Sequence, residues 1–109
     1  MNAELLNELT ALLPKDGILT NPAERLVYDC DAYTVEKSPP DIVVLPTTTA
    51  EVSAIVKACN RHDTPFLARG AGTGLSGGAI ALADTVVICL SRMNRILGVD
   101  AHNRTARVQ

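Results

Sequence analysis

The chain has 109 residues, which is the size of one domain or of part of one. Hydrophobic residues make up 47% of it, aromatic residues only 3%, and tryptophan is absent, so we expect an aliphatic core in an α/β (α+β) arrangement. The formal net charge of −2 lacks the basic excess that accompanies general nucleic-acid binding, and we expect no nucleic-acid partner.

Nothing in the sequence has the features of a targeting or membrane-spanning segment. The N-terminus lacks the basic region and the continuous apolar stretch of a signal peptide, and no run approaches the roughly twenty apolar residues of a transmembrane helix. Cys30, Cys59 and Cys89 are widely spaced and odd in number, which fits neither a disulfide framework nor a zinc site, and we interpret them as buried small hydrophobic residues. We therefore expect a reducing, cytoplasmic location, with attachment to the periphery of the inner membrane left open.

Residues 1–37 are expected to form an N-terminal helical segment. Over residues 2–13 an apolar stripe recurs at helical spacing, formed by Leu5, Leu6, Leu9, Leu12 and Leu13. Pro14 and Gly17 end this helix. Asn21 and Pro22 supply the N-cap and first position of a short second helix over residues 23–28. Residues 29–40 are expected to be a loop, in which residues 31–33 are interpreted as a polar connector packed by Tyr33; the alternative is that these residues face a ligand.

A strand, a helix and a second strand are predicted over residues 41–68. The first strand is the continuously apolar run at residues 42–45, as expected for a strand buried on both faces. Thr48 and Glu51 have capping-box spacing, and an apolar stripe follows at helical spacing to about residue 61 or 62. With a second strand at residues 65–68, the segment is predicted to form one right-handed βαβ unit.

The most distinctive segment is the glycine-rich run over residues 68–78, which directly follows the second predicted strand. Glycine tolerates positive φ and lets a ligand approach the backbone, and successive N–H groups in such a loop attract anions. Arg69 at its start and the hydroxyl groups of Thr73 and Ser76 add to this preference. We interpret the run as a cradle for a phosphate or pyrophosphate, with its glycines at positive φ. The alternative, a flexible surface turn, is disfavoured by Leu75 and by the apolar strands on either side.

Two familiar phosphate-binding motifs do not fit this run. The Walker motif requires Lys and then Ser or Thr after its last glycine, whereas Gly78 is followed by Ala79. The string G-x-G-x-x-G is present over residues 72–77, but a dinucleotide site requires these glycines to open a crossover helix. The residues between the motif and the next strand are too few for a parallel crossover. We therefore reject a nicotinamide dinucleotide site.

Three strands are predicted after the loop, over residues 85–90, 96–99 and 105–108, and the last two form a hairpin. His102 in the hairpin turn and His62 at the helix end are interpreted as solvated, because neither has an acidic or thiol neighbour at metal-ligand spacing. The charges of Lys57, Arg61 and Asp63 are interpreted as exposed helix surface. No metal site, Ser-His-Asp set or carboxylate pair can be assembled, so we assign no catalytic residue.

Three motifs within residues 39–79 carry a family resemblance: Val43-Val44-x-Pro46, Glu51-Val52-x-x-Ile55-Val56-Lys57-x-Cys59-Asn60, and Pro65-x-x-x-Arg69-Gly70-x-Gly72-Thr73-Gly74-Leu75-Ser76-Gly77-Gly78-Ala79. They resemble the start of the FAD-binding domain of the vanillyl-alcohol oxidase/p-cresol methylhydroxylase (PCMH) type. Within that type they resemble the FAD-linked subunit of bacterial glycolate oxidase and the related D-lactate and D-2-hydroxyacid dehydrogenases. The resemblance implies that residues 38–109 are the N-terminal part of a PCMH-type fold.

The resemblance also implies a set of cofactor-binding residues. In the family the loop wraps the FAD pyrophosphate with backbone N–H groups, and the segment around Pro46 lies near the adenosine half. The candidates are Pro46, Arg69, Gly70, Ala71, Gly72, Thr73, Gly74, Leu75, Ser76, Gly77 and Gly78. Some relatives bind flavin covalently through a loop histidine, and the matching position here is Thr73, so we expect non-covalent FAD.

The activity that the resemblance implies is oxidation of a small 2-hydroxy acid to a 2-oxo acid by a flavin enzyme. The family continues beyond the position of Gln109 into the parts that supply catalytic side chains, so we expect this chain alone to lack dehydrogenase activity, to bind FAD weakly and to self-associate through an exposed sheet edge. Other glycolate oxidase subunits are candidate partners. The alternative is a non-catalytic α/β module for nucleotide binding or subunit association.

Overall fold

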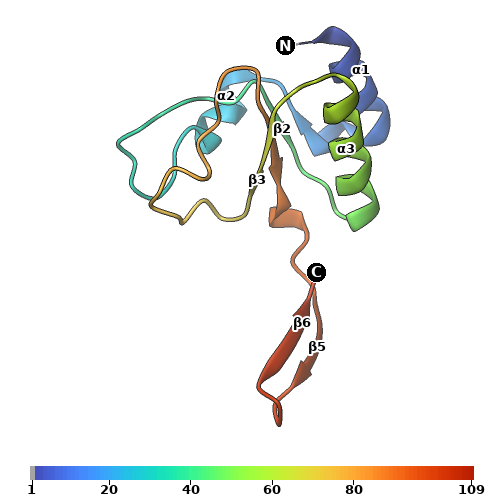
Figure 1. Ribbon diagram of the computed structural model, residues 1–109, viewed down its shortest axis with the longest axis vertical. Coiled ribbons are helices and arrows are strands. Elements are labelled where there is room, and N and C mark those ends of the chain that lie inside the picture. The colour runs from blue at the N-terminus through green and yellow to red at the C-terminus, as the bar shows by residue number, and fades with distance from the viewer. Residues whose placement is uncertain (1) are drawn as a thin grey trace.

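A four-stranded sheet with two helices on one face forms the body of the protein, and a hairpin projects from it (Figure 1). The computed structural model describes residues 2–109. The helices are α1 (Ala3–Leu12), α2 (Pro22–Arg25) and α3 (Thr49–Arg61). In spatial order the sheet contains β1 (Ile18–Leu19), β2 (Ile42–Val44), β4 (Val86–Cys89) and β3 (Phe66–Arg69). The hairpin pairs β5 (Ile96–Asp100) with β6 (Thr105–Val108).

The helices begin where the sequence predicts. Asn2 caps α1 by accepting a hydrogen bond from the Glu4 N–H. Both halves of the capping box at α3 are present, because Thr48 Oγ1 accepts from the Glu51 N–H and the Glu51 carboxylate accepts from the Thr48 N–H. Asn21 caps α2 in the same way as Asn2 caps α1. Short 3₁₀ turns at Lys15–Gly17, Leu26–Tyr28 and Leu90–Arg92 connect the larger elements.

The sheet divides the interior into two apolar clusters, because alternate residues of its strands point to opposite faces. The larger cluster lies between the sheet and the helices and contains Leu5, Leu9, Leu13, Ile42, Val44, Ile55, Ala58, Cys59, Val86 and Ile88. The smaller one lies on the opposite face, where Tyr28 packs against it, and contains Val43, Leu45, Ala81, Val87 and Cys89. The predicted aliphatic core is therefore confirmed. The three cysteines are free, with Cys59 and Cys89 buried as predicted and Cys30 partly exposed.

The strand order corrects one expectation about the chain path. β2 and β3 are each parallel to β4, which lies between them, so the βαβ unit encloses a third strand. Residues 70–85 form the parallel connection from β3 to β4 and contain no helix. Our expectation that too few residues were available for a parallel crossover was wrong, because the glycine loop is itself part of that crossover. A nicotinamide dinucleotide site also requires that the glycines open a helix. The structure has no helix directly after the glycines, as expected.

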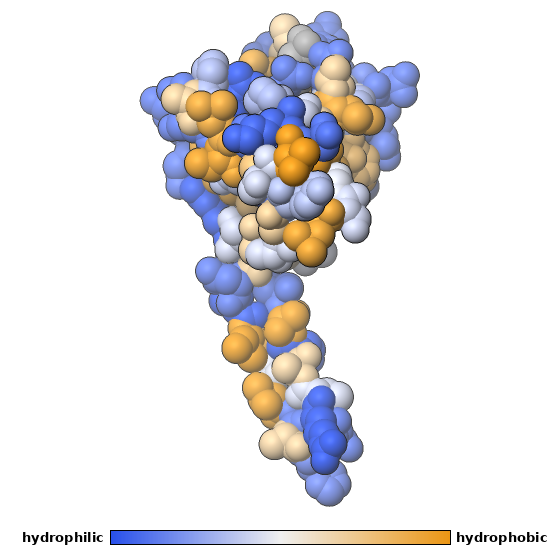
Figure 2. All heavy atoms as spheres, turned by 90° about the vertical axis from the view of Figure 1, so that its left-hand side faces the viewer, coloured by the Kyte–Doolittle hydropathy of each residue, from blue (hydrophilic) through white to orange (hydrophobic). Residues whose placement is uncertain are grey.

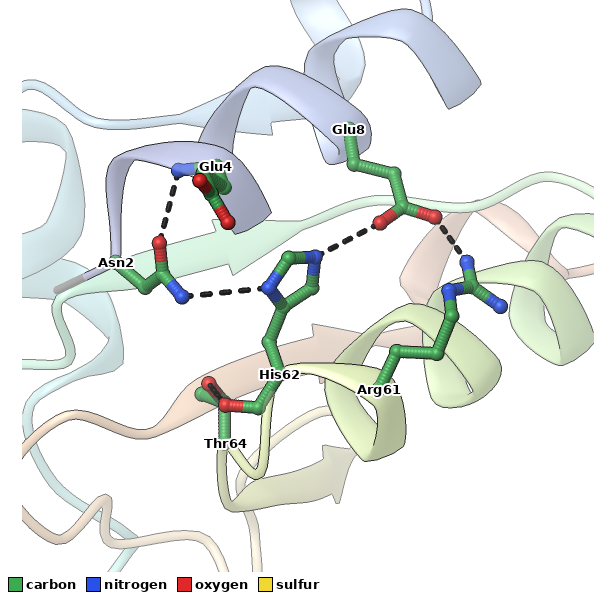
Figure 3. A network of polar contacts seen from close by, with 6 residues as sticks. All are labelled: Asn2, Glu4, Glu8, Arg61, His62 and Thr64. Carbon is green, nitrogen blue, oxygen red and sulfur yellow. Dashed lines mark hydrogen bonds and ion pairs between the residues drawn. The ribbon is translucent and has the colours of Figure 1, made fainter.

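A polar network joins α1 to the end of α3 and corrects one further interpretation (Figure 3). His62 is not solvated: its Nε2 lies 2.9 Å from Glu8 Oε2, and its Nδ1 lies 3.3 Å from the Asn2 side-chain amide. Arg61 is exposed on the helix surface, as interpreted from the sequence, and donates to Glu8 Oε1. Hydrogen bonds from Arg61 and then His62 hold the pKa of Glu8 below its usual value. These contacts link α1 to the C-terminal end of α3.

The remaining expectations concern the small elements and the hairpin. Strand β1 was not predicted; its two residues pair antiparallel with β2 at the sheet edge. The predicted hairpin is present, and Figure 2 shows hydrophobic side chains along its projecting arm. Its exposed apolar side chains are Ile96, Leu97, Val99 and Val108. Within residues 2–109 no helix is long and apolar enough to span a bilayer.

Candidate functional site

The glycine loop leaves the sheet at the carboxyl end of β3. The carboxyl ends of β2, β3 and β4 lie at the same edge because these strands are parallel, and this is the edge at which open α/β sheets bind ligands. The loop lines an open depression of about 370 Å³, formed by residues 68–76, 78 and 79. The sequence prediction of a ligand cradle at this position therefore agrees with the shape of the surface.

The five loop glycines fall into two groups. Gly72 and Gly77 have φ of +72° and +81°, a conformation that residues with a side chain rarely adopt. Gly70, Gly74 and Gly78 do not have positive φ, contrary to our expectation, and a Cβ placed on any of them would meet no atom within 4 Å. At Gly72 and Gly77 the backbone conformation of the loop itself requires glycine. The second group leaves open space in which a ligand can approach the backbone.

Backbone N–H groups in the middle of the loop are available to a ligand. Among residues 2–109, no atom accepts a hydrogen bond from the N–H groups of residues 71–76. The Gly77 N–H is the exception at the end of this run, because it donates to Asp31 Oδ2 at 2.9 Å. A run of unused N–H donors next to open glycine positions suits a multiply charged oxyanion.

Arg69 occupies a different place from the one we expected. Only 8% of it is exposed, and its Nη1 donates to the carbonyl oxygens of Cys30 at 2.8 Å and Ala79 at 3.3 Å. Its guanidinium carbon lies 5.6 Å from the centre of the Tyr28 ring, which is a cation–π distance. A Cβ on Gly72 would overlap the guanidinium, so the positive charge lies directly behind the loop. Arg69 therefore supports the loop from behind, and its charge attracts an anion without a direct contact.

Asp31 was not among the predicted site residues, although residues 31–33 were considered as a segment that could face a ligand. We interpreted residues 31–33 as a polar connector, but Asp31 is 5% exposed and its carboxylate binds the loop at Gly77. The Ala32 N–H also donates to the Gly74 carbonyl oxygen at 3.1 Å. The only available signal was the acidic residue itself within a loop, because nothing in the sequence links it to a glycine 46 residues away.

The other predicted residues divide by exposure. Ala71, Thr73, Leu75 and Ser76 are exposed on the loop, and Leu75 is 67% exposed. Pro46 follows β2 at the same edge of the sheet, but its side chain is fully buried. The structure thus brings the loop residues together around one depression and places the Pro46 ring inside the core.

Comparison with known proteins assigns this loop to a family. The family model described as "FAD binding domain" matches residues 40–109, which is more than half of the chain and includes the whole loop. The chain belongs to this family. FAD is accordingly the cofactor of the domain, and the predicted resemblance to PCMH-type FAD-binding domains is confirmed.

Two curated relatives show the range of similarity. Glycolate oxidase subunit GlcD of Escherichia coli strain K12 is 39% identical over 105 residues, which cover 96% of this chain and 21% of the relative. A D-lactate dehydrogenase of Anaerostipes hadrus is 44% identical over 106 residues, covering 97% of this chain and 22% of the relative. The chain therefore spans about a fifth of the length of the curated relatives it matches.

Solved structures support the same fold. A structure of p-cresol methylhydroxylase with substrate bound has a TM-score of 0.78 and 28% identity, over 91% of this chain and 20% of that one. An alkyldihydroxyacetonephosphate synthase has a TM-score of 0.85 over the whole chain and 23% of its own, and at 24% identity it supports the fold alone. The α/β fold class predicted from the sequence is confirmed.

The loop fits the pyrophosphate part of FAD. A diphosphate carries several oxygens that each accept hydrogen bonds, and the N–H groups of residues 71–76 supply unused donors. The open glycine positions let these oxygens approach the backbone, and the Arg69 charge lies behind them. Among residues 2–109, no cluster of three or more His, Cys, Asp or Glu residues could hold a metal ion.

Proposed function

We propose that residues 70–78 bind the pyrophosphate of FAD through backbone N–H groups in a flavin-dependent oxidoreductase acting on a small 2-hydroxy acid. The observation that carries the proposal is the combination of unused N–H donors with open space at Gly70, Gly74 and Gly78. The relatives named glycolate oxidase subunit and D-lactate dehydrogenase support the substrate class. Residues 38–109 are proposed as the FAD-binding part and residues 1–37 as the helical segment that precedes it.

The part of the reaction assigned to this chain is binding and orientation. Flavin, when bound, supplies the redox chemistry that oxidises a 2-hydroxy acid to a 2-oxo acid. The backbone of residues 71–76 would hold the diphosphate, and Arg69 would offset its negative charge from behind the loop. We assign no catalytic side chain to residues 2–109, and we propose that the chain by itself has no dehydrogenase activity.

Subunit association is a second candidate function, because the hairpin presents exposed apolar side chains away from the body (Figure 2). One of the relatives is named as a subunit, so other subunits of a glycolate oxidase are the proposed partners. A cytoplasmic location, with or without attachment to the inner membrane, stays a prediction from the sequence.

Replacing an open loop glycine tests the site. In Gly74→Val the new side chain has space in the free protein but occupies the proposed ligand position, so we expect folding to be retained and flavin binding to be lost. Gly98→Val is the matched control, because Gly98 in β5 is equally open and lies outside the loop. FAD titration followed by flavin fluorescence measures both variants. Equal affinity of Gly74→Val and Gly98→Val for FAD would show that the loop is not the site.

We also propose that FAD is held non-covalently, because Thr73 stands where covalently flavinylated relatives have histidine, and a threonine side chain lacks the imidazole that forms that bond. Acid precipitation of the FAD-loaded protein should release the flavin into the supernatant. Flavin that stays with the pellet through denaturing washes contradicts this part of the proposal.

A further inference from the structure

The segment before β2 is attached to the glycine loop at three points along the loop. Arg69 Nη1 donates to the Cys30 carbonyl oxygen near the start of the loop, and the Ala32 N–H donates to the Gly74 carbonyl oxygen in its middle. Near the end of the loop, Asp31 Oδ2 accepts from the Gly77 N–H. Arg69 Nη1 also joins the two ends of the loop, because it donates to the Ala79 carbonyl oxygen. A segment that is remote in sequence thus holds the loop along its length.

Asp31 is the centre of this attachment. Its two carboxylate oxygens have separate partners, because Oδ1 accepts from the Tyr33 N–H at 2.9 Å and Oδ2 accepts from the Gly77 N–H at 2.9 Å. The first bond makes residues 31–33 an Asx-turn, which fixes the side chain relative to its own backbone. The second bond then holds the Gly77 N–H against this fixed side chain. Gly77 has φ of +81° and lies at the last turn of the loop.

Because Asp31 is buried, its carboxylate requires hydrogen-bond partners. A carboxylate that is 95% withdrawn from water is stable only if its oxygens are hydrogen-bonded. Both of its bonds are charge-assisted, and such bonds are stronger than those between neutral groups. The negative charge also lies at the end of a loop that binds an anion, where it opposes the ligand.

We propose that Asp31 is a positioning residue for the FAD pyrophosphate: it occupies the Gly77 N–H and thereby sets the shape of the loop, leaving the N–H groups of residues 71–76 for the ligand. This inference rests on the proposed function of the loop and deepens it. Asp31 does not contact the cofactor; it acts through Gly77. The opposing reading is that the carboxylate occupies the place of a phosphate oxygen and is displaced when FAD binds.

The test compares Asp31→Asn with Asp41→Asn. The asparagine at position 31 retains the size of the side chain but only one acceptor oxygen, so one of the two hydrogen bonds is lost. Asp41 is the matched control because its carboxylate also accepts from a backbone N–H of the same β3–β4 connection, that of Asp84 at 2.8 Å, beyond the glycine loop. Asp31→Ala, which removes both acceptors, is the second variant.

Two measurements separate this inference from the proposed function. Hydrogen exchange of the Gly77 amide without FAD is expected to accelerate about tenfold in Asp31→Asn, more in Asp31→Ala, and not in Asp41→Asn. FAD titration is expected to give a dissociation constant about tenfold higher for Asp31→Asn than for Asp41→Asn, with equal urea midpoints for these two variants. If the wild-type protein binds no FAD, the proposed function fails, and the exchange measurement still decides whether Asp31 shapes the loop.

Three results would overturn the inference. Unchanged exchange of Gly77 in Asp31→Ala, which has neither acceptor oxygen, would show that the carboxylate does not hold the loop. Equal FAD affinity of Asp31→Asn and Asp41→Asn would show that it contributes only to stability. Tighter FAD binding by Asp31→Asn would show that the carboxylate competes with the pyrophosphate, which is the opposing reading.

Discussion

Replacing Gly72 with alanine is expected to destabilise the protein much more than the same change at Gly74. Gly72 has φ of +72°, and an alanine in the left-handed region costs about 1–2 kcal/mol. Its Cβ would also overlap the Arg69 guanidinium, which must move away from the Cys30 and Ala79 carbonyl oxygens. Losing one or both of these hydrogen bonds adds about 1–2 kcal/mol. Together these losses amount to roughly 2–4 kcal/mol.

Gly74→Ala is the matched substitution, because its backbone does not have positive φ and its Cβ would meet no atom within 4 Å. Its effect on stability should stay within about 0.5 kcal/mol. Urea unfolding followed by far-UV circular dichroism measures both variants, and a difference of about 1–2 M between their midpoints is expected for an m-value of about 2 kcal/mol/M. The reasoning is refuted if the two variants unfold at the same urea concentration.

Three further predictions concern the helices and the hairpin. Thr48→Ala removes the acceptor of the capping box and should lower the free energy of unfolding by about 1 kcal/mol in urea titrations, whereas Thr10→Ala, a change on the exposed face of α1, should have a smaller effect. The folded-state pKa of Glu8 is lowered, so Glu8 stabilises the fold above its unfolded-state pKa and loses this contribution as the pH falls through the folded-state value. Urea titrations should therefore show that Glu8→Gln destabilises the protein at neutral pH and converges with wild type in acid; a constant difference at all pH values contradicts the ion pairing. Finally, the chain should self-associate through its apolar hairpin, and Val99→Lys should shift it towards monomer in size-exclusion chromatography with light scattering, which an unchanged oligomer distribution would disprove.

Features that depend on neighbouring residues in the sequence were predictable. The capping box of α3 and the buried strand β2 follow from the residue types over a few consecutive positions. The hairpin follows in the same way from two short apolar runs and a polar turn. The glycine loop was recognisable because its composition is unusual, and the family match includes it.

Features that depend on distant partners were not predictable. Strand β1 has only two residues, and it becomes a strand because Ile18 and Leu19 pair with β2. His62 ends α3 in the sequence, but Glu8 of α1 determines its surroundings. Asp31 is similar, because its role is set by Gly77 in a loop that lies beyond two other elements of the sheet. A single sequence carries no information on such pairings.

The position of β4 in the middle of the sheet has a consequence for how the chain folds. During synthesis β2, α3 and β3 are complete before β4 emerges, and until then β2 has only β1 beside it and β3 has no partner strand. The apolar residues of β2 and one face of α3 are therefore not fully buried until Val86–Cys89 joins the sheet. For this to happen, the connection that contains the glycine loop must bring the chain back to the start of the sheet, because β3 and β4 are parallel. The loop that offers its N–H groups to the ligand is thus also part of the connection that allows β4 to pair with β2 and β3, which is a late, non-local folding step. Substitutions that stiffen or misdirect it should slow folding even where they leave the final structure intact.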